Sequence, residues 1–457
     1  MVNAIVSFRT VHLINSNVMA AKTPIYASLA VLFLINILNF YDRNVGNALT
    51  EPLKHEFKLS DQEIGFMSSA FIWLYAIVGV PLGRLADHAN RKYILVGGVL
   101  VWSLLTAMNS FAQTYTHLIL ARLGVAVGEA VVAPTATSWI GDLFPADKRA
   151  RALAIFMLGV PLGGALSYML SGPVAQAYGW RIAMVIAAAP ALLVAPALLF
   201  LEEPKRGAME AHGHSTAAGE SMWSVLRIPT MWWIIASGAL LNFNMYAIHS
   251  FLPSLLIRVH GLSLAQAGIG VGTIMAIGGL SGALLAANLG DRVIRTHQNG
   301  RLMLAAAFAA LGAPAAYLGI VQPNGSIWVA SVFMALAYAS CNSYYGLVYS
   351  SIQDIVAPRQ RASTMSIYFM AMYLCGASLG PLLTGTLSDW RAKTAAQAAG
   401  SAVINAQHRA IGLQEAMLVV PLLLLLLGAV LYAGSRTVEA DMRKRQLESA
   451  GVPAVVG

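Results

Sequence analysis

Charged side chains are scarce in this sequence. Of its 457 residues only 11% are Asp, Glu, Lys or Arg, while 58% are hydrophobic. Soluble globular chains contain about 25% charged residues, so the composition excludes an ordinary soluble domain. The interior of a bilayer disfavours charged groups, and we therefore expect most of the chain to lie in a membrane.

Several other features are missing. The only cysteines, Cys341 and Cys375, both fall in apolar segments, which argues against a disulfide framework or a zinc site. No G-x-x-x-x-G-K-[ST] loop occurs, so ATP-driven pumping is not expected. The N-terminal residues lack a compact apolar core followed by a small-residue cleavage site. We therefore expect the first apolar run to be retained as a membrane helix.

Long apolar runs are what the sequence does contain. A membrane helix needs about 20 apolar residues to cross ~30 Å of hydrocarbon. Twelve such runs predict transmembrane helices over residues 25–48, 62–83, 93–111, 116–138, 150–171, 179–200, 229–256, 263–289, 300–320, 325–350, 360–387 and 411–434. The sequence therefore predicts an all-α membrane protein.

The net charge of +9 is unevenly distributed among the loops. Loops of one parity hold most of the basic residues, among them Arg84, Arg91, Arg149, Arg292 and Arg301. Basic loops face the cytoplasm in membrane proteins. The basicity is therefore a topology signal and not a sign of nucleic-acid binding. We expect both termini in the cytoplasm and a multi-pass protein of the cell (inner) membrane.

The two halves of the chain resemble each other. The segments "DLFPADKRARALAIFMLGVPLGGA" from Asp142 and "DIVAPRQRASTMSIYFMAMYLCGA" from Asp354 share Asp, Arg-Ala, Ile and the final Gly-Ala at a shift of 212. The segments "LSDQEIG" from Leu59 and "LSLAQAG" from Leu262 match at a shift of 203. A parallel repeat of six spans is typical of transporters that hold a site between two bundles.

This repeat predicts how the chain is divided. We expect a cytoplasmic N-terminal segment (1–23), an N-terminal six-helix bundle (24–201), a cytoplasmic linker (202–228), a C-terminal six-helix bundle (229–436) and a cytoplasmic tail (437–457). In the linker, His212 and His214 could bind a metal, but the polar composition favours a solvated loop. No metal and no cofactor is expected.

The loop "GRLADHANRK" (83–92) joins the second and third spans. Gly83 would let two helices approach closely, and Asp87 would accept hydrogen bonds from a helix N-terminus. Arg84 and Arg91 would bridge to acids on the other half. These residues form an expected cytoplasmic gate. A basic loop without a gating role is the alternative.

The same decapeptide closely resembles the G-x-L-a-D-r-x-x-r-k signature of the major facilitator superfamily. "RLGVAVGEA", with Arg122, Gly128 and Glu129, resembles the fourth-helix signature of that family. The resemblance covers about residues 20–436. It implies the major facilitator fold, with two parallel-repeat six-helix bundles, and a transporter that is not an enzyme.

Two further stretches resemble the spinster-like branch, which carries lysophospholipids and sphingoid lipids. They are "NFYDRNVGNALTEPLKHEFKLSDQEIG" and "HSFLPSLLIRVHGLSLAQAG". The Asp-Arg pair of that branch falls on Asp42 and Arg43, and its fourth-helix acid on Glu129. The anion-cation symporters for sugar acids and aromatic acids share a similar pair and acid, so that family is the alternative.

Asp42 and Arg43 lie in the first apolar run, and Glu129 lies in the fourth. Acids inside membrane helices are costly and usually pair or serve a function. In the implied fold these helices are neighbours, so we expect both acids to face one water-filled cavity. The hypothesis is that Asp42 and Glu129 carry protons and that Arg43 sets their balance. A static ion pair is the alternative.

The candidate substrate-binding residues come from three spans. Arg122 lies on roughly the same helix face as Glu129 and suits a phosphate or carboxylate, unless it links groups within the first half. Polar and aromatic residues recur at helical spacing in the seventh and tenth spans: Asn242, Tyr246, His249, Tyr338, Asn342 and Tyr345. Such side chains suit a ligand that is part apolar and part polar. Interhelical packing and structural hydrogen bonds are the alternatives.

Taken together, the sequence predicts a monomeric, proton-coupled carrier that works by alternating access. The expected substrate is an amphipathic anion or zwitterion, such as a lysophospholipid or a sphingoid lipid. The alternative is a proton symporter for a small organic anion. A membrane-embedded lipid-modifying enzyme would need a positioned nucleophile or metal cluster, which the sequence does not show. The expected partners are protons, substrate and the bilayer, with no nucleic acid.

Overall fold

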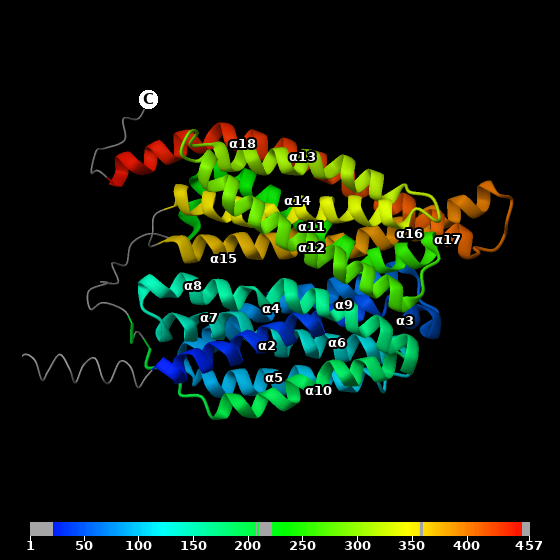
Figure 1. The fold of residues 1–457 in the computed structure, drawn as a ribbon, viewed down its shortest axis with the longest axis horizontal. Helices are drawn as coiled ribbons and strands as arrows, with labels where there is room; N and C mark the ends of the chain where they lie inside the picture. Colours follow the sequence, from blue (N-terminus) through cyan, green and yellow to red (C-terminus); the bar gives the residue numbers. More distant parts are fainter. Residues whose placement is uncertain (1–21, 207, 210–221, 357–359, 450–457) are drawn as a thin grey trace, which may run out of the picture.

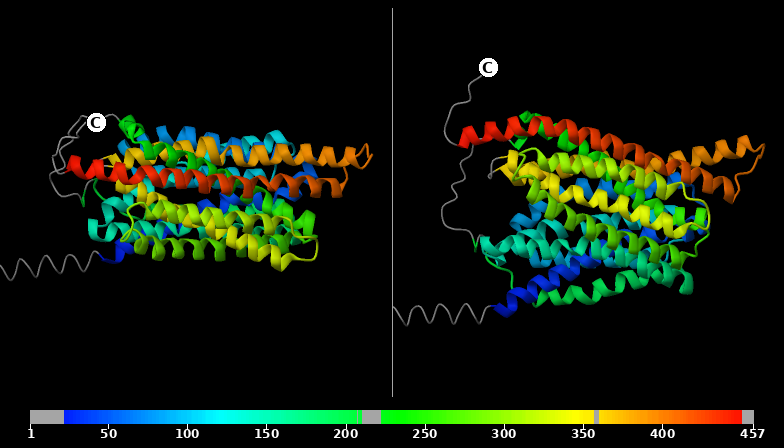
Figure 2. Two further views of the ribbon diagram at one scale, coloured as in Figure 1. Left: turned by 90° about the horizontal axis from the view of Figure 1, so that it is seen from above. Right: turned by 45° about the horizontal axis from the view of Figure 1, so that its top comes forward.

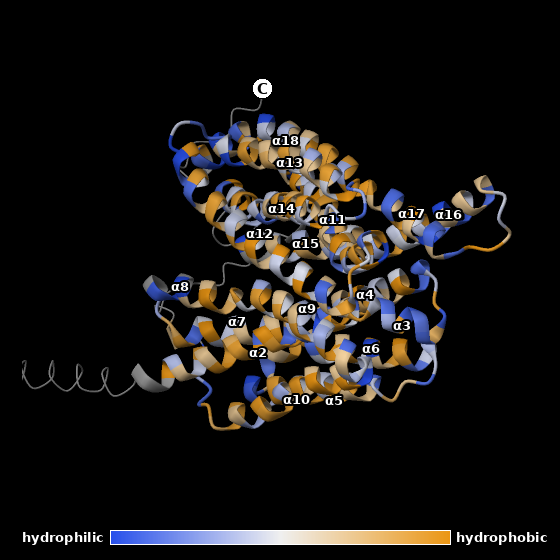
Figure 3. Cartoon of the chain, turned by 45° about the vertical axis from the view of Figure 1, so that its right-hand side comes forward, coloured by the Kyte–Doolittle hydropathy of each residue, from blue (hydrophilic) through white to orange (hydrophobic). Residues whose placement is uncertain are grey.

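The computed structural model describes residues 22–206, 208–209, 222–356 and 360–449. All regular secondary structure in these ranges is helical. Twelve helical stretches are long and apolar enough to cross a membrane, which confirms the predicted number of spans. Figure 3 shows mainly apolar residues along the middle of the helices and hydrophilic residues concentrated towards their ends.

The first half of the chain forms one bundle, in the lower part of Figure 1. Its helices are α2 (Lys22–Ala48), α3 (Thr50–Phe57), α4 (Asp61–His88), α5 (Arg91–Asn109), α6 (Tyr115–Glu129), α7 (Val132–Leu143), α8 (Ala146–Met157), α9 (Gly159–Tyr178) and α10 (Trp180–Leu199).

The second half forms another bundle beside it. A short helix, η1 (Met222–Arg227), leads into α11 (Pro229–His260), α12 (Leu264–Val293), α13 (Gly300–Ile320), α14 (Ile327–Ile355), α15 (Arg361–Met372), the π-helical turn η3 (Tyr373–Ala377), α16 (Leu379–Ala398), α17 (Ala406–Met417) and α18 (Val419–Ser449). The fold is therefore the predicted pair of six-helix bundles.

The helices of both bundles run roughly along one direction, so the molecule has distinct ends (Figure 1). We call the end where α2 begins and α18 finishes the termini end. The opposite end, which carries α3 and α17, is the far end. The halves contact each other mainly through α9 with α12 and α4 with α16. Glycine permits this approach: a Cβ atom on Gly172 would lie 2.7 Å from the carbonyl oxygen of Leu264.

Prolines explain where several helices are interrupted. A proline has no N–H for the carbonyl four residues earlier, and its ring clashes with that carbonyl. The helices α2, α8, η3 and α17 end four residues before Pro52, Pro161, Pro381 and Pro421. Likewise, Pro134 cannot donate a hydrogen bond to the carbonyl of Ala130, four residues earlier, and α6 ends at the neighbouring residue, Glu129. The fourth span is therefore broken next to a candidate site residue.

The last spans are longer than predicted. We expected the eleventh to end at residue 387 and the twelfth to begin at 411, but α16 continues to Ala398 and α17 begins at Ala406. These helices form a hairpin that projects from the far end in Figures 1 and 2. Polar residues end the apolar pattern there, but small residues let the helices pair. A Cβ atom on Gly412 would lie 2.6 Å from the nitrogen of Ala392.

Candidate functional site

A buried ion pair joins α2 to α6 in the first bundle. Arg43 Nε on α2 donates a 3.0 Å hydrogen bond to Glu129 Oε2 at the end of α6. Arg43 is 8% exposed and Glu129 is fully buried. The guanidinium also lies over the rings of Tyr75 and Phe40, at 4.2 and 4.8 Å from their centroids. The cation is thus held between a carboxylate and aromatic faces.

Asp42 has a different partner. Its Oδ2 atom accepts a 2.5 Å hydrogen bond from Thr106 Oγ1 of α5. Within the described residues, Asp42 Oδ1, Arg43 Nη2 and Glu129 Oε1 are buried without a hydrogen-bond partner. Unsatisfied buried polar atoms are rare in native structures and usually have a functional reason or an unseen water.

The water-filled cavity expected around these acids is not what surrounds them in this conformation. Asp42 is only 1% exposed and Glu129 is fully buried. The hydroxyl of Thr106, the guanidinium of Arg43 and the rings beside it account for the enclosure. The acids therefore share a buried polar cluster.

Arg122 binds within the first half, which was one of the two readings of its sequence position. Its Nη1 and Nη2 atoms donate to the backbone carbonyls of Asp42 and Arg43, each at 3.4 Å. Arg122 is 6% exposed, and any side chain at Gly46 would collide with its guanidinium. Arg122 therefore fixes the backbone that carries the Asp-Arg pair.

The predicted substrate residues of the second half come together across α11 and α14. His249 Nε2 lies 3.0 Å from the hydroxyl of Tyr338, and the Tyr345 hydroxyl donates to Asn242 Oδ1 at 3.4 Å. Asn342 donates to the Tyr338 carbonyl at 3.0 Å. The ring of Tyr246 is 5.9 Å from that of His249. All of the six predicted residues are buried or half-buried.

Aromatic contacts connect this cluster to Arg43. The ring of Tyr75 on α4, which Arg43 covers, lies 6.0 Å from Tyr373 of η3. Tyr373 in turn lies 6.5 Å from Tyr246. Tyr75 and Tyr373 were not predicted from the sequence. Phe71 and Tyr75 are four residues apart, which is the spacing of one helix face, so this pair could have indicated an aromatic surface. Tyr373 opens a π-helical turn, a feature often found at functional sites.

The residues of the expected gate lie at the termini end, and Arg91 is the most strongly bound. It is fully buried and contacts Asp142 Oδ2 at 2.5 Å and Glu203 Oε1 at 2.9 Å. Its acidic partners thus belong to the first half or follow directly after α10, and not to the second half. Arg301 repeats the contact in the second half, at 2.6 Å from Asp354.

The remaining gate residues are less engaged. Arg84 is exposed, and the side chain of Asp87 lies outside the described part of the structure. A Cβ atom on Gly83 would meet Pro134 at 3.8 Å, an ordinary contact distance. The close helix approach expected at Gly83 is therefore absent in this conformation.

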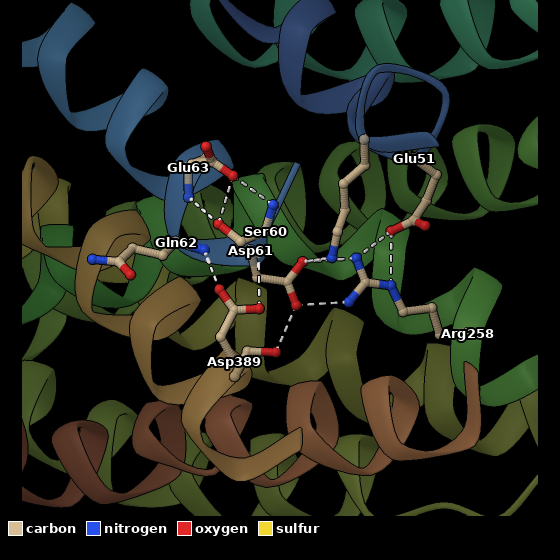
Figure 4. Close-up of polar contacts among 9 residues, drawn as sticks. Glu51, Ser60, Asp61, Gln62, Glu63, Arg258 and Asp389 are labelled. Carbon is tan, nitrogen blue, oxygen red and sulfur yellow. Dashed lines mark hydrogen bonds and ion pairs between the residues drawn. The ribbon is translucent and has the colours of Figure 1, made fainter. Parts of the chain in front are cut away.

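A second charged cluster, which was not predicted from the sequence, lies at the far end (Figure 4). Arg258 of α11 donates to both carboxylate oxygens of Asp61, each at 2.8 Å, and to Glu51 Oε1 at 2.6 Å. Lys54 also pairs with Asp61. Burial lowers the pKa of the Lys54 ammonium, while the Asp61 carboxylate opposes that shift. We call Glu51, Lys54, Asp61 and Arg258 the far-end network.

The α16 helix reinforces this network from the second half. Ser388 Oγ donates to Asp61 Oδ2 at 2.7 Å. The Asp389 carboxylate accepts from the backbone N–H groups of Asp61 and Gln62, at 3.1 and 2.7 Å, and so caps the start of α4 (Figure 4). The far end of the molecule is therefore closed by charge-assisted bonds between the halves.

Metal sites are not a feature of the described residues. No group of three or more His, Cys, Asp or Glu side chains there could hold a metal ion, and Cys341 and Cys375 are free. The linker histidines His212 and His214 lie outside the described residues.

Comparison with known proteins gives the family. Residues 32–381 match the Major Facilitator Superfamily. An MFS-type efflux pump of Mycolicibacterium smegmatis is 31% identical over 80% of this chain and 84% of the relative. The chain belongs to the major facilitator superfamily.

Within the superfamily, this carrier is spinster-like. Protein spinster homolog 1 of Homo sapiens is 28% identical over 93% of this chain and 83% of its own length. A crystal structure of a bacterial homolog of the human lysosomal transporter spinster, inward-facing and unoccupied, aligns with a TM-score of 0.82 and 28% identity. It covers 92% of this chain and 99% of that chain.

These matches confirm the predicted fold, the spinster-like branch and a secondary transporter of a small-molecule substrate. The superfamily consists of transporters, which confirms that the chain is not an enzyme. The roles of the individual site residues are not decided by these similarities and stay predictions.

We expect the thermal stability of this carrier to depend on the Arg43–Glu129 pair. Arg43→Gln leaves the Glu129 carboxylate buried without its cation, which costs about 3–5 kcal/mol. We expect a clear loss of thermal stability in detergent. Arg43→Gln/Glu129→Gln should recover much of the stability. Equal losses for the single and the double variant would contradict the role of the pair.

Proposed function

We propose that the chain is a proton-coupled carrier for an amphipathic anion or zwitterion, such as a lysophospholipid or a sphingoid lipid. The observation that carries this proposal is the buried cluster of Asp42, Arg43 and Glu129 beside the tyrosines of the second half. We assign the termini end to the cytoplasm because of its basic loops, and the protein to the cell (inner) membrane.

The buried acids favour protons as the coupling ion. Arg43 neutralises Glu129, whereas Asp42 accepts its hydrogen bond from the neutral hydroxyl of Thr106. Ionised groups without a close cation are costly inside a membrane, so a change in surroundings can make either acid take up a proton. Protonation of Glu129 would release Arg43, whose Nη2 atom already lacks a partner among the described residues.

A released Arg43 would be a ready partner for an anionic substrate group. A guanidinium binds phosphate or carboxylate through several N–H groups, and the neighbouring tyrosine rings offer an apolar surface with polar hydroxyls. This pairing of a cation with aromatic rings suits an amphipathic molecule better than a small sugar acid. The spinster-like relatives support a lipid substrate, and the mycobacterial efflux pump supports export.

The contacts between the halves support alternating access as the proposed mechanism. The far-end network joins the halves on the proposed outer side, so the site would open towards the cytoplasm in this conformation. The similarity to an inward-facing spinster homolog supports that assignment. Opening the far end requires Arg258 to leave Asp61 and Glu51. Gly83, Arg84, Asp87 and Arg91 are the proposed contacts that would then close the termini end.

Transport by purified protein in liposomes tests the substrate class. With an imposed pH gradient, we expect movement of labelled lysophospholipid or sphingoid phosphate well above protein-free liposomes, and no movement of labelled glucuronate. The reverse result would favour the small-anion symporter. Movement of lysolipid at the same rate with and without the pH gradient would support the lipid substrate but exclude proton coupling.

Asp42→Asn tests the proton site. The amide keeps the size of the side chain but cannot bind a proton in the relevant range. We expect gradient-driven transport to fall to the level of protein-free liposomes while exchange of internal for external substrate continues. Glu439→Gln, which changes an exposed acid on α18, is the matched control. Unchanged gradient-driven transport by Asp42→Asn would refute the proton role.

Arg258→Gln tests the far-end network. Removing one partner of a buried charge pair costs about 2–5 kcal/mol, which should raise the population open at the far end roughly tenfold or more. Distances between spin labels on α3 and α17 would report the opening. Arg391→Gln breaks a half-exposed 2.9 Å pair with Glu415 inside the second half and should leave the distances unchanged. Identical distance distributions for both variants would exclude the network as a gate.

A further inference from the structure

The exposed side of α18, which we call its outer face, carries a pattern of residues that has no part in the proposed transport mechanism. Leu422, Leu425 and Tyr432 are 64%, 54% and 48% exposed, and Arg436 and Arg443 are also exposed. These positions recur at intervals of three, seven, four and seven residues, so they lie on one side of a helix. That side runs from an apolar stripe to a tyrosine and then to two cations.

Arg436 is held in a fixed geometry on this face. Its Nη2 atom donates a 2.7 Å hydrogen bond to the hydroxyl of Tyr432, and its guanidinium lies 5.0 Å from the centroid of the same ring. Among the described residues Arg436 forms no ion pair. One face of the guanidinium is therefore covered by the Tyr432 ring, and its other N–H groups have no hydrogen-bond acceptor among the described residues.

The end of α18 that carries these cations is anchored and not merely an extension into solvent. Asp441 Oδ2 accepts from the backbone N–H and the hydroxyl of Thr230, at 3.0 and 2.6 Å, and so caps the start of α11. Arg445 donates to the carbonyl of Gln353 at 2.8 Å at the end of α14. The surface around Arg436 and Arg443 is thus preformed.

The spacing along α18 matches the depth of one leaflet. At ~1.5 Å per residue, Leu422 and Tyr432 are about 15 Å apart along the axis, which is half of a ~30 Å hydrocarbon layer. Tyrosine is enriched at the membrane surface, so Arg436 falls at the level of the lipid head groups. Trp232, at the nearby start of α11, is 57% exposed and fits the same level.

The local charge at this level is positive. Among the α18 side chains that the structure describes beyond Tyr432, Arg436, Arg443 and Lys444 are exposed together with a single exposed acid, Glu439. Clusters of basic residues immediately beside a transmembrane helix attract anionic lipids. A zwitterionic head group would gain less from this surface because its own cation would be repelled.

We propose that the outer face of α18 binds an anionic phospholipid from the leaflet at the termini end. Its phosphate lies between Arg436 and Arg443, and one acyl chain follows Leu425 and Leu422. The bound lipid packs against the same helix end that caps α11 and contacts α14, so it stabilises the second bundle. This site is separate from the transport site and does not depend on the transported substrate.

Native mass spectrometry of the purified full-length protein tests this site. After exchange out of mixed phosphatidylglycerol and phosphatidylcholine nanodiscs, we expect retention of phosphatidylglycerol over phosphatidylcholine. Each arginine near the surface contributes about fivefold to binding, so Arg436→Gln/Arg443→Gln should lower retention by more than about tenfold. Tyr432→Phe, which removes only the hydroxyl, should lower it by a smaller factor.

A matched pair of exposed cations at the same end provides the control. Arg292→Gln/Arg295→Gln removes the same charge near the end of α12 and should leave phosphatidylglycerol retention unchanged. Equal retention by the Arg436→Gln/Arg443→Gln variant and the unmodified protein would overturn the proposal. Equal loss from both pairs would also overturn it, because the effect would then reflect net charge and not this site. Thermal unfolding of each variant confirms that it is folded.

Discussion

A buried charge needs a partner, and this constraint organises the centre of the molecule. Glu129 stands where Pro134 interrupts the fourth span, and Arg43 reaches it from α2. Arg122 then binds the carbonyls of Asp42 and Arg43. The one ion pair described at the centre, Arg43 with Glu129, is therefore contained within the first half, while the second half contributes neutral amides, an imidazole and tyrosines.

At the far end, buried charges are neutralised by contacts between the two halves. There, Arg258 of the second half neutralises Asp61 and Glu51 of the first. The central pair can persist when the halves move, because both members travel together. The far-end pairs cannot, because their members belong to different halves. The central ion pair thus lies within one bundle, whereas the far-end ion pairs would have to break if the bundles separated at that end.

Apolar runs predicted the spans well because hydrocarbon excludes charge over a fixed length. The Arg43–Glu129 contact was also foreseeable, since the resemblance made the first and fourth helices neighbours. The contact between Arg258 and Asp61 was not, because it joins residues 197 positions apart at helix ends, where charged residues are common. The burial of Asp42 and Glu129 was missed for a related reason: it depends on contacts with side chains of neighbouring helices, such as Thr106 and Tyr75, which periodicity does not encode.

The cap that Asp389 provides for α4 has a consequence of its own. Ser60 and Glu63 already form a capping box at that helix start, so α4 keeps its beginning when Asp389 withdraws. The amides of Asp61 and Gln62 then exchange a carboxylate for solvent. Closing this side of the carrier would therefore remove water from these two amides, so the equilibrium between a closed and an open far end would depend on water activity.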